Sequence, residues 1–252
     1  MTNLSAKNIS FYIDKNKIIN DVNLDINAGE LVCLVGPNGA GKSSLMKLLL
    51  GLIKPSSGMI MLNGQSMKHY PRKEKAIEIS YLPQVRTVDW SVSVYDVIKL
   101  GRYPHNQNLN YLNKTDKDAI DKAISLCGLE NFIYRKIDTL SGGEISLVHC
   151  ARAFASEAPF LFADEIVASL DPFHEIKIMN ILRDYIKTKN SALIIMHNLN
   201  LATHFADRII WMKDGSILAD GNPKNNLNPE LVKDTFGVQC TVNELEISVI
   251  KD

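Results

Sequence analysis

No stretch of the chain approaches the ~20 consecutive apolar residues that a membrane-spanning helix needs. The first ten residues also lack the apolar core of a signal peptide, so we expect the chain to stay in the cytoplasm. Neither charge sign is in excess, because 28 lysines and arginines balance 28 aspartates and glutamates. Without a global basic field, the composition gives no indication of a nucleic-acid partner.

Cysteine is sparse, and its spacing matches no metal-binding pattern. The four cysteines show no C-x-x-C spacing, and the six histidines form no i,i+4 pair. Three of the cysteines lie in apolar surroundings, which is typical of reduced, buried thiols. A zinc site built from cysteines remains the weaker alternative to this interpretation.

The most informative stretch runs from Leu31 to Gly51. Its first five residues, Leu31 to Val35, are all apolar and predict a strand buried on both faces, as in a parallel sheet. The loop that follows fits the pattern G-x-x-x-x-G-K-[ST], in which backbone N–H groups converge on phosphate at a helix N-terminus. A tight turn without a ligand is the alternative. The loop residues are Gly36, Pro37, Asn38, Gly39, Ala40, Gly41, Lys42 and Ser43.

Within this loop we expect Lys42 to reach the β- and γ-phosphates of a nucleotide and Ser43 to bind Mg²⁺. A second apolar run, Phe160 to Ala163, leads into two carboxylates. Asp164 is suited to hold the magnesium ion, and Glu165 to orient or deprotonate the attacking water. The alternative is a pair of carboxylates at the start of a helix.

Two further features indicate phosphate contacts. The apolar run Ser191 to Met196 ends at His197, at the sheet edge where ligands collect in open α/β folds, although such a histidine can be a packed surface residue. Ser141 and Glu144 form a predicted capping box that opens a helix, with Gly142 and Gly143 between them. Two glycines leave backbone donors bare, so an anion site is an alternative to a simple cap.

The remaining patterns complete an α/β fold. Alternating residues at 9–13 and 18–26 predict antiparallel strands, and Tyr12 there either faces the core or stacks on a nucleobase. Helical spacing at 92–100 and 115–128 predicts an inserted helical subdomain at about 85–158. We therefore expect one domain over 1–252, with a phosphate-loop core, a mostly parallel sheet, an antiparallel β layer and the helical insertion.

Together these motifs resemble the ATP-binding subunit of an ATP-binding cassette (ABC) transporter over essentially the whole chain. In this resemblance Walker A is Gly36 to Ser43 followed by Ser44, the Q-loop residue is Gln84, the signature is Leu140 to Glu144, Walker B is Phe160 to Asp164, the D-loop is Ser169 to Asp171, and the switch histidine is His197.

The resemblance implies roles for these residues. Two cassettes pair head to tail, so that ATP lies between the Walker A motif of one copy and Ser141, Gly142 and Gly143 of the other. The implied catalytic residues are Glu165, His197 and Gln84. The implied Mg²⁺ ligands are Ser43, Gln84 and Asp164. The implied further nucleotide contacts are Ser44, Asp171 and the aromatic ring of Tyr12.

Other stretches are similar to subunits of ferric siderophore, haem or cobalamin importers, with zinc and manganese importers as close relatives. They are Gly101 to His105, Leu199 to Ala202, Ala206 to Arg208 and Phe236 to Val238. The resemblance implies a polytopic membrane permease as partner, a substrate-binding protein acting indirectly, and a place on the inner face of the membrane. A soluble ABC-type ATPase and a P-loop kinase remain alternatives.

Two positions depart from the family pattern. Ile145-Ser146-Leu147 replaces a polar and basic run, and Ile166 replaces a proline. Neither change removes a phosphate or metal ligand, so we expect them to affect packing or rate rather than binding.

Overall fold

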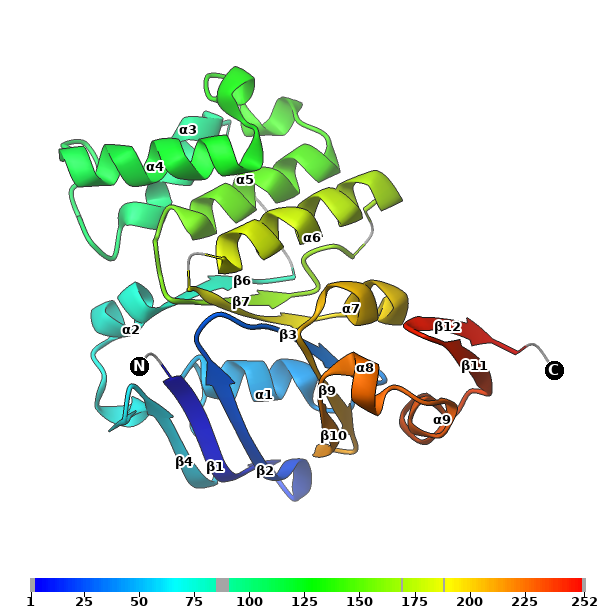
Figure 1. The fold of residues 1–252 in the computed structure, drawn as a ribbon. Helices are drawn as coiled ribbons and strands as arrows, with labels where there is room; N and C mark the ends of the chain where they lie inside the picture. Colours follow the sequence, from blue (N-terminus) through cyan, green and yellow to red (C-terminus); the bar gives the residue numbers. More distant parts are fainter. Residues whose placement is uncertain (1–2, 85–90, 169, 188, 251–252) are drawn as a thin grey trace. The chain divides into compact units, whose positions relative to one another are not determined.

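The computed structural model describes residues 3–84, 91–168, 170–187 and 189–250. They fall into two compact units, one combining Met1–Tyr70 with Ser191–Asp252 and the other comprising Pro71–Asn190 (Figure 1). The predicted start of the helical insertion, at about 85, lies outside the described residues. The single-domain assignment of 1–252 stays a prediction.

The first unit contains the strand that precedes the phosphate loop, β3 (Leu31–Val35). It pairs in parallel with β8 (Ser191–Ile195) on one side and with β9 (Arg208–Lys213) on the other. β9 continues through a hairpin into the antiparallel strand β10 (Ser216–Gly221). All five residues of β3 and all five of β8 are buried, which confirms the interpretation of both apolar runs as interior strands.

An antiparallel layer belongs to the same unit. It has the order β2-β1-β4-β5, formed by β1 (Asn3–Ile13), β2 (Asn16–Asn27), β4 (Ser57–Leu62) and the short β5 (Gln65–Ser66). Buried and exposed residues alternate along β2, so one face of the layer is covered. The predicted antiparallel strands are therefore confirmed, and they are longer than the sequence indicated.

The helices of this unit begin at two kinds of N-cap, a left-handed glycine or an asparagine side chain. α1 (Lys42–Leu49) follows the phosphate loop, and α7 (Leu199–Phe205) follows β8, with the Asn198 side chain as its N-cap. Near the carboxyl end, α8 (Pro223–Asn226) and α9 (Pro229–Phe236) lead to a hairpin of β11 (Cys240–Asn243) and β12 (Glu246–Val249). α9 stops at Gly237, which is in the left-handed conformation typical of a helix C-terminus.

The second unit is built on a parallel pair, β6 (Ile79–Leu82) and β7 (Phe160–Asp164). Its helices are α2 (Arg72–Glu78), α3 (Val94–Lys99), α4 (Lys114–Cys127), α5 (Gly142–Phe154) and α6 (Pro172–Ile186). α5 packs against both α3 and α4, as Figure 1 shows in the upper part of the ribbon. The helices predicted at 92–100, at 115–128 and after Ser141 are confirmed.

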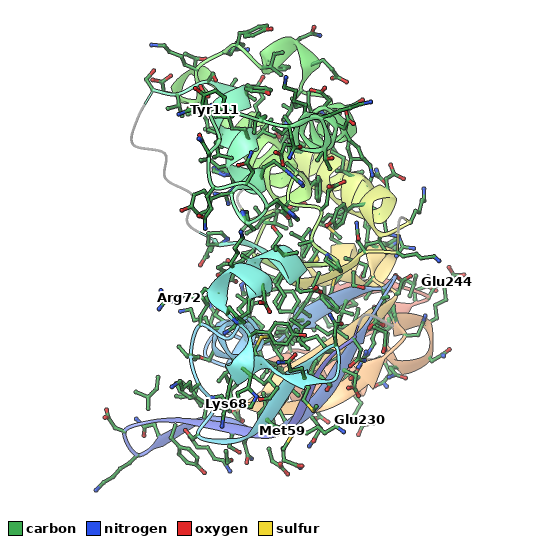
Figure 2. All side chains as sticks on the ribbon, turned by 90° about the vertical axis from the view of Figure 1, so that its left-hand side faces the viewer. Met59, Lys68, Arg72, Tyr111, Glu230 and Glu244 are labelled. Carbon is green, nitrogen blue, oxygen red and sulfur yellow. The ribbon has the colours of Figure 1, made fainter. Side chains whose placement is uncertain are left out.

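The helix α2 was not predicted from the sequence. None of the α2 residues is buried, and Arg72 at its start projects from the surface (Figure 2). Because the helix lacks an apolar stripe, hydrophobic periodicity gives no signal for it.

Of the helices in the described part of the chain, none combines the length and the apolar character that crossing a bilayer requires.

All four cysteines are buried thiols, which confirms the interpretation drawn from the apolar surroundings of three of them. Burial, and secondarily the charge of Asp207, raises the pKa of the Cys33 thiol to about 12. At neutral pH this side chain is therefore a small apolar core residue rather than a nucleophile.

The stretch Gly101 to His105, which resembles importer subunits, has a structural role. Arg102 is 3% exposed, and its Nε lies 3.0 Å from Oδ1 of the buried Asp116 at the start of α4. Its Nη1 donates to the carbonyl oxygen of Ala155, just after α5, at 2.8 Å and to Glu157 at 3.0 Å. Burial acts to raise the pKa of Asp116, but hydrogen bonds from Arg102 and Asn106 outweigh it and hold the pKa below its usual value. The arginine thus joins α4 to the end of α5.

Arg102→Ala is expected to lower the free energy of unfolding by about 3–5 kcal/mol, because the Asp116 carboxylate is left buried without its cation. Urea unfolding of the purified chain measures this change. Arg72, an exposed arginine of the same unit, is the matched control, and Arg72→Ala is expected to cost about 0.5 kcal/mol or less. Equal effects of the two substitutions would show that the buried ion pair does not stabilise this unit.

Candidate functional site

The phosphate loop surrounds the amino group of Lys42. This side chain is 6% exposed, and its Nζ donates to the carbonyl oxygens of Gly36 at 2.8 Å and Pro37 at 2.9 Å. The loop is closed by a hydrogen bond from the N–H of Ala40 to the carbonyl oxygen of Pro37, at 3.2 Å. A lysine charge is therefore enclosed by the loop, directly at the N-terminus of α1.

Two glycines of the loop are required by its packing. A β-carbon on Gly36 would lie 2.2 Å from the carbonyl oxygen of Met212 in β9. Gly41, the N-cap of α1, has a φ of 97°, and a β-carbon there would lie 2.9 Å from the carbonyl oxygen of Ile18. The loop is thus pressed against β9 and β2, and its shape is set by the surrounding strands.

The N-terminus of α1 provides backbone N–H donors beside the phosphate loop. The N–H groups of the first turn of α1, including those of Ser43 and Ser44, have no partner within the helix itself, and the helix dipole favours an anion there. Ser43 is exposed and Ser44 half-buried, while Asn38 and Gly39 are exposed at the loop tip. The donor set and the enclosed lysine fit a nucleotide phosphate.

His197 lies on the same edge of the same unit. β3 and β8 run parallel, and the N–H of Met196 donates to the carbonyl oxygen of Leu34 at 3.2 Å, so the two strands end together. Gly36 follows the first strand and the exposed His197 follows the second. The assignment of His197 as a phosphate contact stays a prediction, and its position is the one that the assignment needs.

Tyr12 does not face the core. Its side chain is 43% exposed, and Nζ of Lys17 lies 5.7 Å from the centre of its ring. The core alternative of the sequence interpretation is therefore wrong, because a core tyrosine would be buried. Stacking on a nucleobase stays a prediction for this residue.

The second unit contains the predicted catalytic carboxylates. Asp164, 6% exposed, is the last residue of β7, and Glu165 follows it with a φ of 52°, in the left-handed region. Such a conformation is unusual for glutamate and is often found at functional sites. Nε2 of Gln84 donates to Oε2 of Glu165 at 2.6 Å. The structure thus joins two of the predicted catalytic residues by a hydrogen bond.

Ser141 is the N-cap of α5, and the predicted capping box is confirmed. Its Oγ accepts from the N–H of Glu144 at 3.3 Å, while a Glu144 carboxylate oxygen accepts from the N–H of Ser141 at 2.7 Å. Hydrogen bonds from the backbone and side chain of Ser141 lower the pKa of Glu144. The Ser141 hydroxyl accepts from the N–H of Glu144 and donates to the Glu144 carboxylate, so it can donate to an anion only by turning its proton away from that carboxylate.

Asp171 is the N-cap of α6, and Ser169, earlier in the predicted D-loop, lies outside the described residues. Asp171 accepts from the backbone N–H of His174 at 3.1 Å, and its second oxygen lies 2.6 Å from Nδ1 of the same histidine. Sequence reasoning missed His174, although its spacing of three residues from a helix N-cap is the spacing of a capping box.

Both departures from the family pattern include buried side chains. Leu147 is 3% exposed and Ile166 is 1% exposed. The side chains at both positions therefore contribute to packing, as expected, and an arginine at 147 would place a charge in the core.

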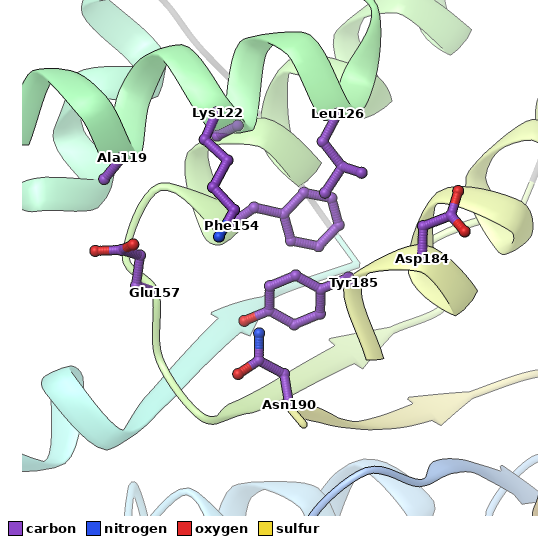
Figure 3. Close-up of a pocket in the computed structure, with 9 residues that line it drawn as sticks. Ala119, Lys122, Leu126, Phe154, Glu157, Asp184, Tyr185 and Asn190 are labelled. Atoms are coloured by element: carbon purple, nitrogen blue, oxygen red, sulfur yellow. The ribbon is translucent and has the colours of Figure 1, made fainter. Parts of the chain in front are cut away.

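A cavity of about 280 Å³ lies in the second unit, at α4, α5 and α6, and contains none of the predicted site residues. Phe154 and Tyr185 stack at its centre with ring centroids 4.5 Å apart (Figure 3). The hydroxyl of Tyr185 donates to the carbonyl oxygen of Ala158 at 2.7 Å, so this buried polar group already has a partner.

Comparison with known proteins agrees with this geometry. The family profile described as ABC transporter matches residues 19–168. A probable siderophore transport system ATP-binding protein of Bacillus subtilis, YusV, is 32% identical over 245 residues, covering 97% of this chain and 89% of that protein. The hemin import ATP-binding protein HmuV of Gloeobacter violaceus is 35% identical over 246 residues, covering 95% of this chain and 89% of that protein.

A solved structure has the same fold. The chain superposes on cbiO1 from Clostridium perfringens, part of the ABC transporter complex cbiONQ, with a TM-score of 0.78 and 27% identity, covering 88% of this chain and 89% of that one. The resemblance drawn from the motifs and the expected α/β fold class are both confirmed.

Proposed function

The chain belongs to the ABC transporter family, and on that premise we propose that it is the ATP-hydrolysing subunit of an importer for a ferric siderophore, haem or cobalamin. The observation that carries the proposal is the enclosed amino group of Lys42, 6% exposed at the N-terminus of α1. A buried ammonium with carbonyl oxygens as partners suits exchange of those partners for phosphate. A P-loop kinase would not account for the family match over 19–168.

The phosphate loop binds ATP in this proposal. Backbone N–H groups of the first turn of α1 and the Lys42 ammonium contact the phosphates, and Tyr12 offers a face to the base. The proposed ligands of Mg²⁺ are Ser43 and, from the second unit, Asp164 and Gln84; hydroxyl, carboxylate and amide oxygens are the donor types that this ion prefers. When bound, Mg²⁺ supplies neutralisation of phosphate charge.

Glu165 acts on the attacking water. Its carboxylate would accept the proton of that water as the oxygen attacks phosphorus. The hydrogen bond from Gln84 fixes one carboxylate oxygen at 2.6 Å and so orients the group before reaction. His197 would contact the γ-phosphate from its position after β8.

A second copy of the chain completes the site in this proposal, arranged head to tail. Around Gly142, among the described residues, no atom lies within 4 Å of where a β-carbon would be. Packing against the described part of the chain therefore does not require a glycine here, where alanine favours the helix. Close approach of a nucleotide held by the partner copy would explain the glycine at 142. In this arrangement the Ser141 hydroxyl and the first N–H groups of α5 donate to the phosphate. Asp171 would lie beside them and contact the partner copy.

The chain would act at the cytoplasmic face of the membrane, through a polytopic permease that receives cargo from a binding protein. The relatives named for siderophore and hemin import favour an iron chelate or haem over zinc or manganese. Co-purification with a membrane permease, followed by ATP-driven uptake of haem, a ferric siderophore and cobalamin into proteoliposomes, tests this proposal. ATP turnover without any membrane partner would instead favour the soluble ABC-type alternative.

We propose that the permease docks between Val85 and His105. Trp90 and Val85 lie outside the described residues, while Tyr103 is 56% exposed. Tyr103→Ala combined with Trp90→Ala is expected to abolish permease-stimulated ATP turnover and uptake while ATP binding persists, because such aromatic anchors are worth about 2 kcal/mol or more each.

Tyr134 provides the matched control, since it is 89% exposed in the same unit but outside this segment. Tyr134→Ala is expected to leave uptake unchanged. If the double variant transported at the wild-type rate, the docking surface would lie elsewhere.

A further inference from the structure

The two glycines of the signature differ in their surroundings within the chain. Gly143 is buried, and a β-carbon added to it would lie 2.4 Å from Cδ2 of His174 and 2.6 Å from both its Cγ and its Nε2. Nearly equal distances to three ring atoms mean that the added atom would meet the face of the imidazole, because an approach along one edge would leave the other two atoms farther away. Such short contacts require the ring to move.

The ring is held in place by Asp171. Its Nδ1 lies 2.6 Å from one carboxylate oxygen, and the other oxygen accepts from the backbone N–H of the same histidine at 3.1 Å. Phe173 contacts the ring edge-on, with centroids 5.3 Å apart. The hydrogen bond from the ring also lowers the pKa of Asp171. His174 therefore cannot turn away from Gly143 without breaking its contact with the N-cap of α6.

Gly142 provides the contrast. No described atom lies within 4 Å of a β-carbon at that position. Among the described residues, the His174 ring thus requires a glycine at 143, whereas no packing contact requires one at 142. Substitutions at the two positions should consequently respond differently to removal of the His174 ring.

We propose that His174 is a positioning residue for the first turn of α5. Asp171 fixes the imidazole, the imidazole abuts Gly143, and this contact sets the direction of the N–H groups at 142 and 143. The proposal rests on the proposed function, in which those N–H groups contact a phosphate held by the partner copy. His174 itself touches no phosphate, so its effect passes entirely through the backbone of the signature.

The experiment is a pair of double-mutant cycles in the reconstituted transporter: Gly143→Ala and Gly142→Ala, each with and without His174→Ala. His174→Ala alone is expected to lower kcat about tenfold and to change KM for ATP by about twofold or less, because the phosphate loop is untouched. Gly143→Ala is expected to lower kcat by about a hundredfold, and His174→Ala to restore about tenfold of that loss. The kcat of Gly142→Ala is expected not to rise when His174→Ala is added.

Urea unfolding of the full chain gives a readout independent of ATP. Gly143→Ala is expected to lower the unfolding midpoint and His174→Ala to restore it, whereas Gly142→Ala is expected not to lower it. If His174→Ala changed the effects of the two glycine substitutions equally, in turnover and in urea, the positioning role would be refuted. A change in KM without a change in kcat would refute it as well. Wild-type ATP turnover no higher than that of Lys42→Ala would refute the proposed function instead. In that case the urea unfolding midpoints of the same variants would still show whether the His174 ring packs on Gly143.

Discussion

Replacing Glu165 by glutamine is expected to lower ATP turnover by about 10²–10⁴-fold, the range spanned by a general base. Glutamine keeps the shape of the side chain and can still bond to Gln84, but it cannot accept a proton from water. ATP should therefore bind and remain, and the variant should accumulate as an ATP-bound dimer. Turnover assays and size-exclusion chromatography with ATP measure the two effects.

Glu130 is the matched control for this substitution. It is an exposed glutamate of the same unit, in the short 3₁₀ turn Glu130–Phe132, and Glu130→Gln is expected to hydrolyse ATP at the wild-type rate. Wild-type turnover by Glu165→Gln would show that this carboxylate does not act on the water, and the assignment would pass to another group.

Replacing Lys42 by alanine is expected to weaken ATP binding by about a hundredfold, or about 3 kcal/mol, because charge-assisted hydrogen bonds to phosphate are lost. The defect differs in kind from that of Glu165→Gln, since Lys42 acts on bound ATP before any chemistry. Titration with a fluorescent ATP analogue measures the affinity.

Lys47 offers the control within the same helix, α1, where its side chain is exposed. Lys47→Ala is expected to bind ATP as the wild type does. Loss of ATP affinity in both variants would indicate that general positive charge attracts the nucleotide. Unchanged ATP affinity in Lys42→Ala would show that Lys42 does not contact the bound nucleotide.

The phosphate loop and its strand could be predicted from the sequence because each depends on local chemistry. A run of five apolar residues, Leu31 to Val35, specifies a strand covered on both faces, and the pattern of glycines and lysine that follows specifies a loop. The capping box of Ser141 and Glu144 was predictable for the same reason, since its hydrogen bonds span only three residues.

Contacts between residues distant in sequence could not be predicted. The clash of a β-carbon on Gly36 with the carbonyl oxygen of Met212 arises only when β3 and β9 pair. The packing of His174 on Gly143 arises likewise from the placement of α6 beside α5. A single sequence carries no periodic signal for such pairs, because each member obeys the pattern of its own element.

The resemblance in Gly101 to His105 illustrates a third case. The sequence indicated a subfamily but not why these residues occur together, whereas the structure places Arg102 in a buried ion pair with Asp116 that joins α4 to the end of α5. Part of the similarity of Gly101 to His105 to importer subunits is therefore explained by packing and not by the transported substrate.

Whether this chain hydrolyses ATP to drive transport is tested most directly by ATP turnover of the chain assembled with its permease in proteoliposomes, measured side by side for the wild type and Glu165→Gln. We expect turnover by the wild type to rise when the binding protein delivers cargo, and turnover by Glu165→Gln to be lower by about 10²-fold or more. Wild-type turnover no higher than that of Glu165→Gln would contradict this expectation, because a chain with an intact phosphate loop would then bind ATP without driving transport.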